Sequence, residues 1–190
     1  RGRHCGSRLP ASYVVTEAAL GLLFVLAYGA LGLGLPFLAF LAALSLLTFI
    51  VLYDVQHTIV PPAASFLFFL AALGFSFLVS ESMRGFGFTL LVAGGTSLFL
   101  FSIYALSRGR AMGLGYAPVA FSLALMTGGT LAFAGLLFSF WIGALFGIAV
   151  LLARRGGPTM GIEVPFVPFL AAGFLLAYFT QWNPLPLFIP

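Results

Sequence analysis

The sequence predicts an all-α protein that crosses a membrane about seven times as a helix bundle, with its N-terminus on the cytoplasmic side. Of its 190 residues, 62% are hydrophobic and only 6% are charged, whereas a soluble domain is about 45–50% apolar and about 25% charged. Eight basic and four acidic residues are too few to cover a globule in water. The net charge of +4 is too small and scattered for a nucleic-acid-binding face, and a single Cys excludes a disulfide scaffold.

The membrane spans follow from the apolar runs. A spanning helix needs about 20 mostly apolar residues, and Gly, Pro and charged residues interrupt such runs. Seven segments satisfy this, near residues 13–34, 37–53, 62–80, 86–106, 116–133, 135–153 and 165–182. The turn between the fifth and sixth segments is marked only by Gly128, Gly129 and small residues, so it could lie several residues to either side.

The arginines orient these segments, because cytoplasmic loops near helix ends collect Lys and Arg. Seven of the eight fall on one side of the predicted membrane: Arg1, Arg3, Arg8, Arg108, Arg110, Arg154 and Arg155. Only Arg84 falls on the other side. This distribution predicts a cytoplasmic N-terminus and an external C-terminus, and Arg108 and Arg110 are expected to contact lipid phosphates. Residues 1–12 are polar and show no cleavable signal peptide.

Asp54 is the only Asp in the chain and directly follows the second apolar run. An ionisable side chain at bilayer depth costs about 2.5–3.5 kcal/mol on insertion scales, so each one is a functional candidate. The alternative is that Asp54 lies in water at the membrane rim and marks the helix end. His57 follows three residues later and could lie on the same helix face. It has no further ligands at metal-binding spacing, so no metal site is expected.

A second candidate stretch is Gly113-Leu114-Gly115-Tyr116, on the same predicted side as Asp54. Two glycines before a helix let the backbone approach another helix or an extended substrate closely. Tight helix packing would explain the same pattern. Glu17 and Glu163 open the first and last spans, where the helix dipole favours negative charge; both are kept as supporting candidates.

Taken in order, these motifs resemble those of the type IV prepilin peptidases, which are membrane aspartyl proteases of the Gly-x-Gly-Asp class. The matching segments are His4-Cys5-Gly6 followed by residues 13–17, residues 53–61 around Asp54, residues 112–115, and Val164-Pro165-Phe166-Val167-Pro168-Phe169-Leu170. The resemblance covers nearly the whole chain. It implies that residues 1–12 are the remnant of the family's cytoplasmic Cys-x-x-Cys segment and that residues 13–190 form the transmembrane peptidase domain.

The resemblance also implies the function. Members of this family are multi-pass proteins of the prokaryotic cytoplasmic membrane, and they cut the basic leader of type IV prepilins or pseudopilins after a Gly. It assigns Asp54 and position 116 to the catalytic pair and Gly113, Leu114 and Gly115 to the active-site loop. Some members are also N-methyltransferases that use zinc and S-adenosylmethionine. Because the upstream region is absent, neither cofactor is expected in this chain.

Three residues depart from the family pattern: Tyr116 replaces the second catalytic Asp, Gly2 replaces a Cys and Val167 replaces a Gly. An aspartyl protease needs two carboxyl groups that share one proton, one as the base and the other as the acid. A phenol, with a usual pKa of about 10, donates a hydrogen bond at neutral pH but does not act as the charged partner. The sequence therefore predicts the family fold with impaired or absent cleavage.

Two other functions fit parts of the sequence. The protein could bind pilin precursors without cutting them, which is what Tyr116 would produce. It could instead be a small proton-coupled transporter in which Asp54 carries the ion, although no helix pair broken at the midplane supports this.

Overall fold

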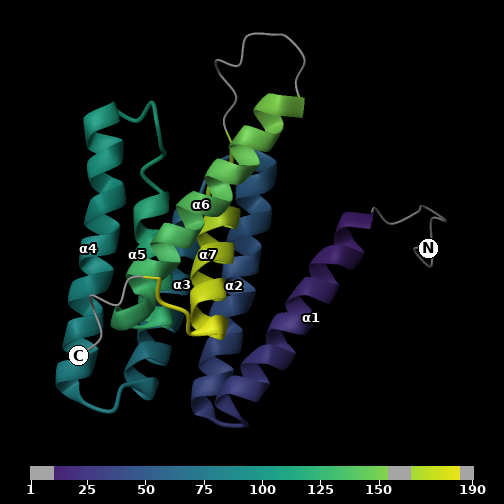
Figure 1. Ribbon diagram of the computed structural model, residues 1–190. Coiled ribbons are helices and arrows are strands. Elements are labelled where there is room, and N and C mark those ends of the chain that lie inside the picture. The colour runs from purple at the N-terminus through teal and green to yellow at the C-terminus, as the bar shows by residue number, and fades with distance from the viewer. Residues whose placement is uncertain (1–10, 154–163, 185–190) are drawn as a thin grey trace.

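A computed structural model describes residues 11–153 and 164–184, with side chains from residue 14 onward. Among these residues the regular structure is entirely helical, which confirms the predicted fold class (Figure 1). The helices are α1 (Ala11–Leu31), α2 (Leu35–His57), α3 (Pro62–Val79), α4 (Met83–Ser107), α5 (Tyr116–Thr127), α6 (Gly129–Ala153) and α7 (Val167–Thr180). They run alternately up and down, so the C-terminal ends of α2, α4 and α6 share one end of the bundle.

Five of the helices, namely α1, α2, α3, α4 and α6, are long and apolar enough to cross a bilayer. The other two, α5 and α7, have 12 and 14 residues and measure only about 18 and 21 Å at a rise of about 1.5 Å per residue. Both are shorter than the hydrocarbon core of about 30 Å. Such short helices are tolerated at membrane depth because protein, rather than lipid, surrounds them.

The predicted boundary between the fifth and sixth spans was wrong by about six residues, since α5 ends at Thr127 and α6 begins at Gly129. The chain reverses at Gly128, whose backbone angles (φ 87°, ψ 153°) are open to glycine but not to ordinary L-residues. The amide of Gly128 ends α5 by donating to the Ala124 carbonyl, and the Gly128 carbonyl accepts from the amides of Leu131 and Ala132 at the start of α6.

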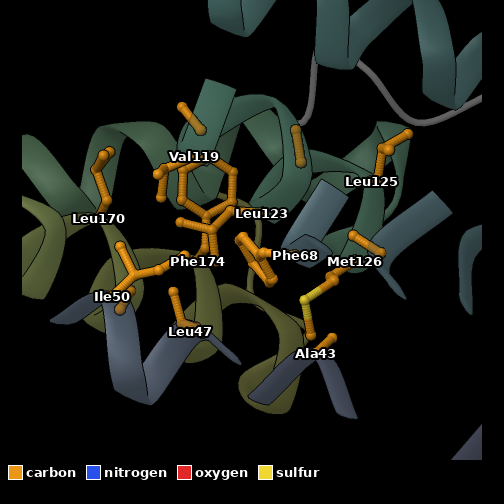
Figure 2. Packing of buried hydrophobic residues seen from close by; sticks show 14 of the residues in the cluster. Ala43, Leu47, Ile50, Phe68, Val119, Leu123, Leu125, Met126, Leu170 and Phe174 are labelled. Atoms are coloured by element: carbon orange, nitrogen blue, oxygen red, sulfur yellow. The ribbon is translucent and has the colours of Figure 1, made fainter. Parts of the chain in front are cut away.

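The core is built around α5, in which ten of twelve residues are buried. Figure 2 shows α5 side chains meeting those of α2, α3 and α7. The labelled residues are Ala43, Leu47 and Ile50 of α2, Phe68 of α3, Val119, Leu123, Leu125 and Met126 of α5, and Leu170 and Phe174 of α7. By contrast, α1 leans away from the bundle (Figure 1) and packs mainly against α2.

The helices α6 and α7 approach each other closely at Gly173. A Cβ atom added at Gly173 would lie 2.3 Å from the amide nitrogen of Ser139 and 2.6 Å from the carbonyl oxygen of Gly135. The Ser139 hydroxyl donates to the Gly135 carbonyl at 2.7 Å and contacts the Leu170 carbonyl of α7 at 3.3 Å. Small residues of this kind let helix backbones touch in a membrane, and here they fix the position of α7.

Candidate functional site: a buried carboxylate beneath an open cavity

Asp54 lies in the last turn of α2 and is completely buried. The prediction that the second span ends at residue 53 was wrong by four residues, because the helix continues to His57 and closes when the Thr58 amide donates to the Asp54 carbonyl at 2.7 Å. The alternative of a rim carboxylate in water is therefore excluded by its full burial. A carboxylate removed from water in this way requires hydrogen-bond partners.

Both carboxylate oxygens of Asp54 have such partners. The Tyr116 hydroxyl donates to Oδ1 at 3.3 Å, and the backbone amide of Val167 donates to Oδ2 at 3.0 Å. Three helices thus meet at one side chain, since Asp54 belongs to α2, Tyr116 begins α5 and Val167 begins α7. The structure brings together the two positions that the family resemblance assigns to the catalytic pair, and it places the N-terminus of α7 against one of them.

Tyr116 is held by the loop before it and by an aromatic neighbour. Its amide donates to the Gly113 carbonyl at 3.4 Å, and its ring meets the Phe166 ring edge-on with centroids 5.9 Å apart. A Cβ at Gly115 would lie 2.7 Å from the Cβ of Val60. Only glycine at 115 allows the loop before α5 to pack this closely on the loop between α2 and α3, and this contact sets Tyr116 beside Asp54.

Sequence reasoning noted Val167 only as a departure from a motif and missed its backbone role. Because Val167 is the first residue of α7, its amide has no acceptor within the helix. The positive end of the helix dipole at this terminus favours a nearby carboxylate. Pro168 was the signal in the sequence for the start of this helix, since proline is common in the first turn of a helix. Pro168 does not indicate, however, which acceptor the Val167 amide bonds.

A cavity of about 910 Å³ opens above this pair and has Tyr116 in its wall, whereas Asp54 lies behind the wall. One side consists of loop residues 58–60 and 109–115. The opposite side combines small residues of α6 with aromatic rings: Gly143, Ala144, Gly147, Phe140, Phe166 and Phe169. Arg110 is the one charged residue among the described residues that line it.

The loop that lines the cavity contains backbone amides without a hydrogen-bond acceptor among the described residues. Within the described part of the chain, the amides of residues 111–115 donate to no acceptor, and all five residues line the cavity. A row of free amides beside an apolar wall is suited to an extended peptide, whose carbonyls accept the hydrogen bonds while its side chains enter the apolar part.

The supporting candidates lie elsewhere. His57 is exposed, and its ring contacts that of Tyr53 at a tilt of 45° with centroids 4.5 Å apart, so the structure does not bring it to Asp54. Glu17 is exposed on α1, the helix that leans away from the bundle. Glu163, like residues 1–10, lies outside the described residues. Among the residues that the structure describes, no three His, Cys, Asp or Glu side chains form a group suited to a metal ion.

The fold and this site define a polytopic helical membrane protein in which a buried carboxylate is held beneath a cavity at one end of the bundle. The chain is similar to the prepilin leader peptidase/N-methyltransferase of Bacillus subtilis (strain 168), with 31% identity over 176 residues that cover 93% of this chain and 69% of that protein. It belongs to the type IV prepilin peptidase family. No protein-family profile and no solved structure matches the chain.

Proposed function

We propose that this protein has the substrate site of an aspartyl prepilin peptidase, that it binds type IV pilin or pseudopilin precursors at the cytoplasmic face of a prokaryotic inner membrane, and that it is impaired in cutting their leader. The proposal gives Asp54 and position 116 the roles of the catalytic pair. It gives the loop Gly113-Leu114-Gly115 the role of holding the substrate backbone.

The observation that carries the proposal is the hydrogen-bonded pair of Asp54 and Tyr116, 3.3 Å apart in a buried position. In a competent aspartyl site, one carboxylate removes a proton from the attacking water while the other, protonated, polarises the scissile carbonyl. Here the second group is a phenol. It can donate a hydrogen bond, but it cannot exchange a proton with Asp54 at the usual pKa of about 10 for a tyrosine.

Access of water to Asp54 is also restricted. One oxygen accepts from Tyr116 and the other from the Val167 amide, and the side chain has no exposed surface. A general base must lie within hydrogen-bond reach of the proton that it removes, either directly or through one water. A carboxylate that has no exposed surface and does not line the cavity does not meet this condition.

The cavity supports the binding half of the proposal. A peptidase must extend its substrate before the scissile carbonyl can be attacked, and the free amides of residues 111–115 match the carbonyls of an extended segment.

The two-carboxylate reaction uses side chains and water, so the proposal includes neither zinc nor S-adenosylmethionine. The site lies at the same end of the bundle as Arg108 and Arg110, the end that the arginine distribution predicts to be cytoplasmic.

A prepilin cleavage assay in membranes tests the proposal. The unmodified chain, Tyr116→Asp, and Tyr116→Asp with Asp54→Ala are compared on one precursor. We expect cleavage by Tyr116→Asp alone, because only this form has two carboxyl groups at the site. If the unmodified chain cuts as fast as Tyr116→Asp, the assignment at position 116 is wrong, and Glu17 or Glu163 becomes the next acid to test.

A second candidate function is that of a scaffold that binds precursors without cutting them. The observation that favours it is that the cavity remains open while Asp54 is closed, so binding does not depend on the missing acid. A precursor that co-purifies intact with the unmodified chain supports this function. Proton flux in liposomes that requires Asp54 would instead support a transporter.

A further inference from the structure

A second hollow lies on the outer face of α3, α4 and α5, and it is lined almost entirely by apolar side chains. Its volume is about 580 Å³, and its wall includes Gly94, Ser97, Leu98 and Phe101 of α4. Among the described residues that line it, Ser97 is the one polar residue and none is charged. We call this hollow the lateral groove. It is separate from the cavity above Asp54 except for one shared residue.

That shared residue is Leu114, which lines both the lateral groove and the cavity. Leu114 is 50% exposed, and it belongs to the loop whose residues 111–115 line the cavity. Ala117, directly after Tyr116, also lines the groove. The groove and the cavity therefore adjoin at Leu114, in the loop that leads to the buried pair.

From this continuity we infer that the lateral groove docks the apolar transmembrane helix of the pilin precursor, and that the chain passes over Leu114 into the cavity as an extended segment. This inference rests on the proposed function. A polypeptide within the hydrocarbon region must satisfy its own backbone hydrogen bonds and is therefore helical. Once it reaches the free amides of residues 111–115, it finds donors for its carbonyls and can unwind.

The shape of the groove matches a helix. Gly94, Ser97 and Leu98 are spaced three and four residues apart, so they lie on one face of α4. Gly94 and Ser97 are small, and small residues let a second helix approach closely in a bilayer. A lipid acyl chain would also fill an apolar hollow, but it has no carbonyls in its hydrocarbon part for the amides at the end of the groove.

Photo-crosslinking tests the docking directly. A benzoylphenylalanine is placed at Leu98, in the groove, or at Phe99, which is also exposed on α4 but does not line it. The probe is a labelled pilin precursor with its leader and apolar helix, in nanodiscs with the unmodified chain. We expect at least tenfold more precursor adduct at position 98 than at 99. Equal labelling, or adducts with lipid alone at 98, would overturn the inference.

Filling the groove gives a functional test with a closely matched control. A Cβ at Gly94 or at Gly95 meets nothing within 4 Å, so neither Gly94→Leu nor Gly95→Leu clashes within the protein at this atom. Gly94 lines the groove and Gly95 does not. In the Tyr116→Asp background we expect Gly94→Leu to raise KM for the precursor at least tenfold and Gly95→Leu to leave it unchanged.

The two experiments separate this inference from the proposed function. Cleavage by Tyr116→Asp that is insensitive to Gly94→Leu refutes the groove and retains the peptidase site. Precursor adducts specific to position 98, in a protein that Tyr116→Asp does not activate, support the groove and refute the catalytic assignment. Failure of both cleavage and specific adducts refutes both.

Discussion

The packing of α6 on α7 provides a quantitative test of how the fold holds the site. In Gly173→Ala, the new Cβ lies 2.3 Å from the backbone nitrogen of Ser139. Ordinary van der Waals contact begins at 3.4 Å, so the two helices must separate locally by about an ångström. The atoms that the new Cβ meets include backbone atoms of Ser139 and Gly135, and a rotamer change cannot relieve those contacts.

The expected cost follows from these contacts. Overpacking a tight core costs about 1–3 kcal/mol, and the rigid backbone contact places Gly173→Ala near the upper end. Separating the helices also weakens the contact of the Ser139 hydroxyl with the Leu170 carbonyl, worth about 0.6 kcal/mol in membrane proteins. The helix-forming gain of Gly→Ala, about 0.5–1 kcal/mol, offsets part of this. We expect a net loss of about 2–3 kcal/mol.

The matched control is Gly74→Ala on the exposed face of α3, where an added Cβ meets nothing within 4 Å. The substitution is chemically identical and retains only the helix-forming gain, so its free energy of unfolding should be unchanged or higher by up to about 1 kcal/mol. Unfolding is followed by SDS titration in mixed micelles through tryptophan fluorescence. Trp182 stacks on Phe138 of α6 with ring centroids 5.4 Å apart, so it reports on this part of the bundle.

Equal stability of Gly173→Ala and Gly74→Ala would refute the claim that backbone contact sets the α6–α7 spacing. A second readout connects this packing to the site, because α7 carries the Val167 amide that donates to Asp54. In the Tyr116→Asp background, Gly173→Ala should also lower prepilin cleavage, whereas Gly74→Ala should not. Loss of stability with full cleavage would show that the Asp54 site tolerates displacement of α7.

Three further substitutions test the hydrogen bond to Asp54, the packing of the loop before α5, and the turn between α5 and α6. Tyr116→Phe leaves Oδ1 of Asp54 without its donor and should lower the free energy of unfolding by about 1–3 kcal/mol in the same titration; no loss would contradict the hydrogen bond. Gly115→Ala, whose Cβ would lie 2.7 Å from Val60 Cβ, should weaken precursor binding, and adding Val60→Ala should restore it if this contact is the cause. Gly128→Ala, at φ 87° with open space around it, should destabilise the turn by about 1–3 kcal/mol through backbone strain alone, seen as a lower midpoint in SDS.

The sequence predicts the fold class well because composition and apolar run length are sufficient to identify membrane helices. It predicts helix ends poorly where small residues continue through a turn. Gly128 reverses the chain inside a run that is apolar on both sides, and hydropathy alone does not mark that position. The shortness of α5 also depends on enclosure by other helices, which is a tertiary property.

The site was predictable only in part. The spacing of Asp54 and Tyr116 along the chain, 62 residues, carries no information about their contact, and only the family resemblance paired them. The spacing of His57 allowed it to lie on the same helix face as Asp54, but His57 is exposed and its ring contacts that of Tyr53, one turn earlier on α2. The Val167 donor and the row of free amides belong to the backbone, so residue types could not reveal them.

Under the proposed function, the pair at this site also explains how the fold can keep Asp54 buried with no second carboxyl group beside it. In a working aspartyl pair, one of the two groups is protonated and donates a hydrogen bond to the other. The Tyr116 hydroxyl donates to Asp54 Oδ1 in the same sense, so the phenol reproduces the bonding of the protonated acid without its proton exchange. An alanine at position 116 would leave the buried carboxylate short of a partner, which costs about 1–3 kcal/mol or more for a charged group. Under the proposed function, tyrosine at position 116 therefore keeps the geometry of the site and removes its proton exchange.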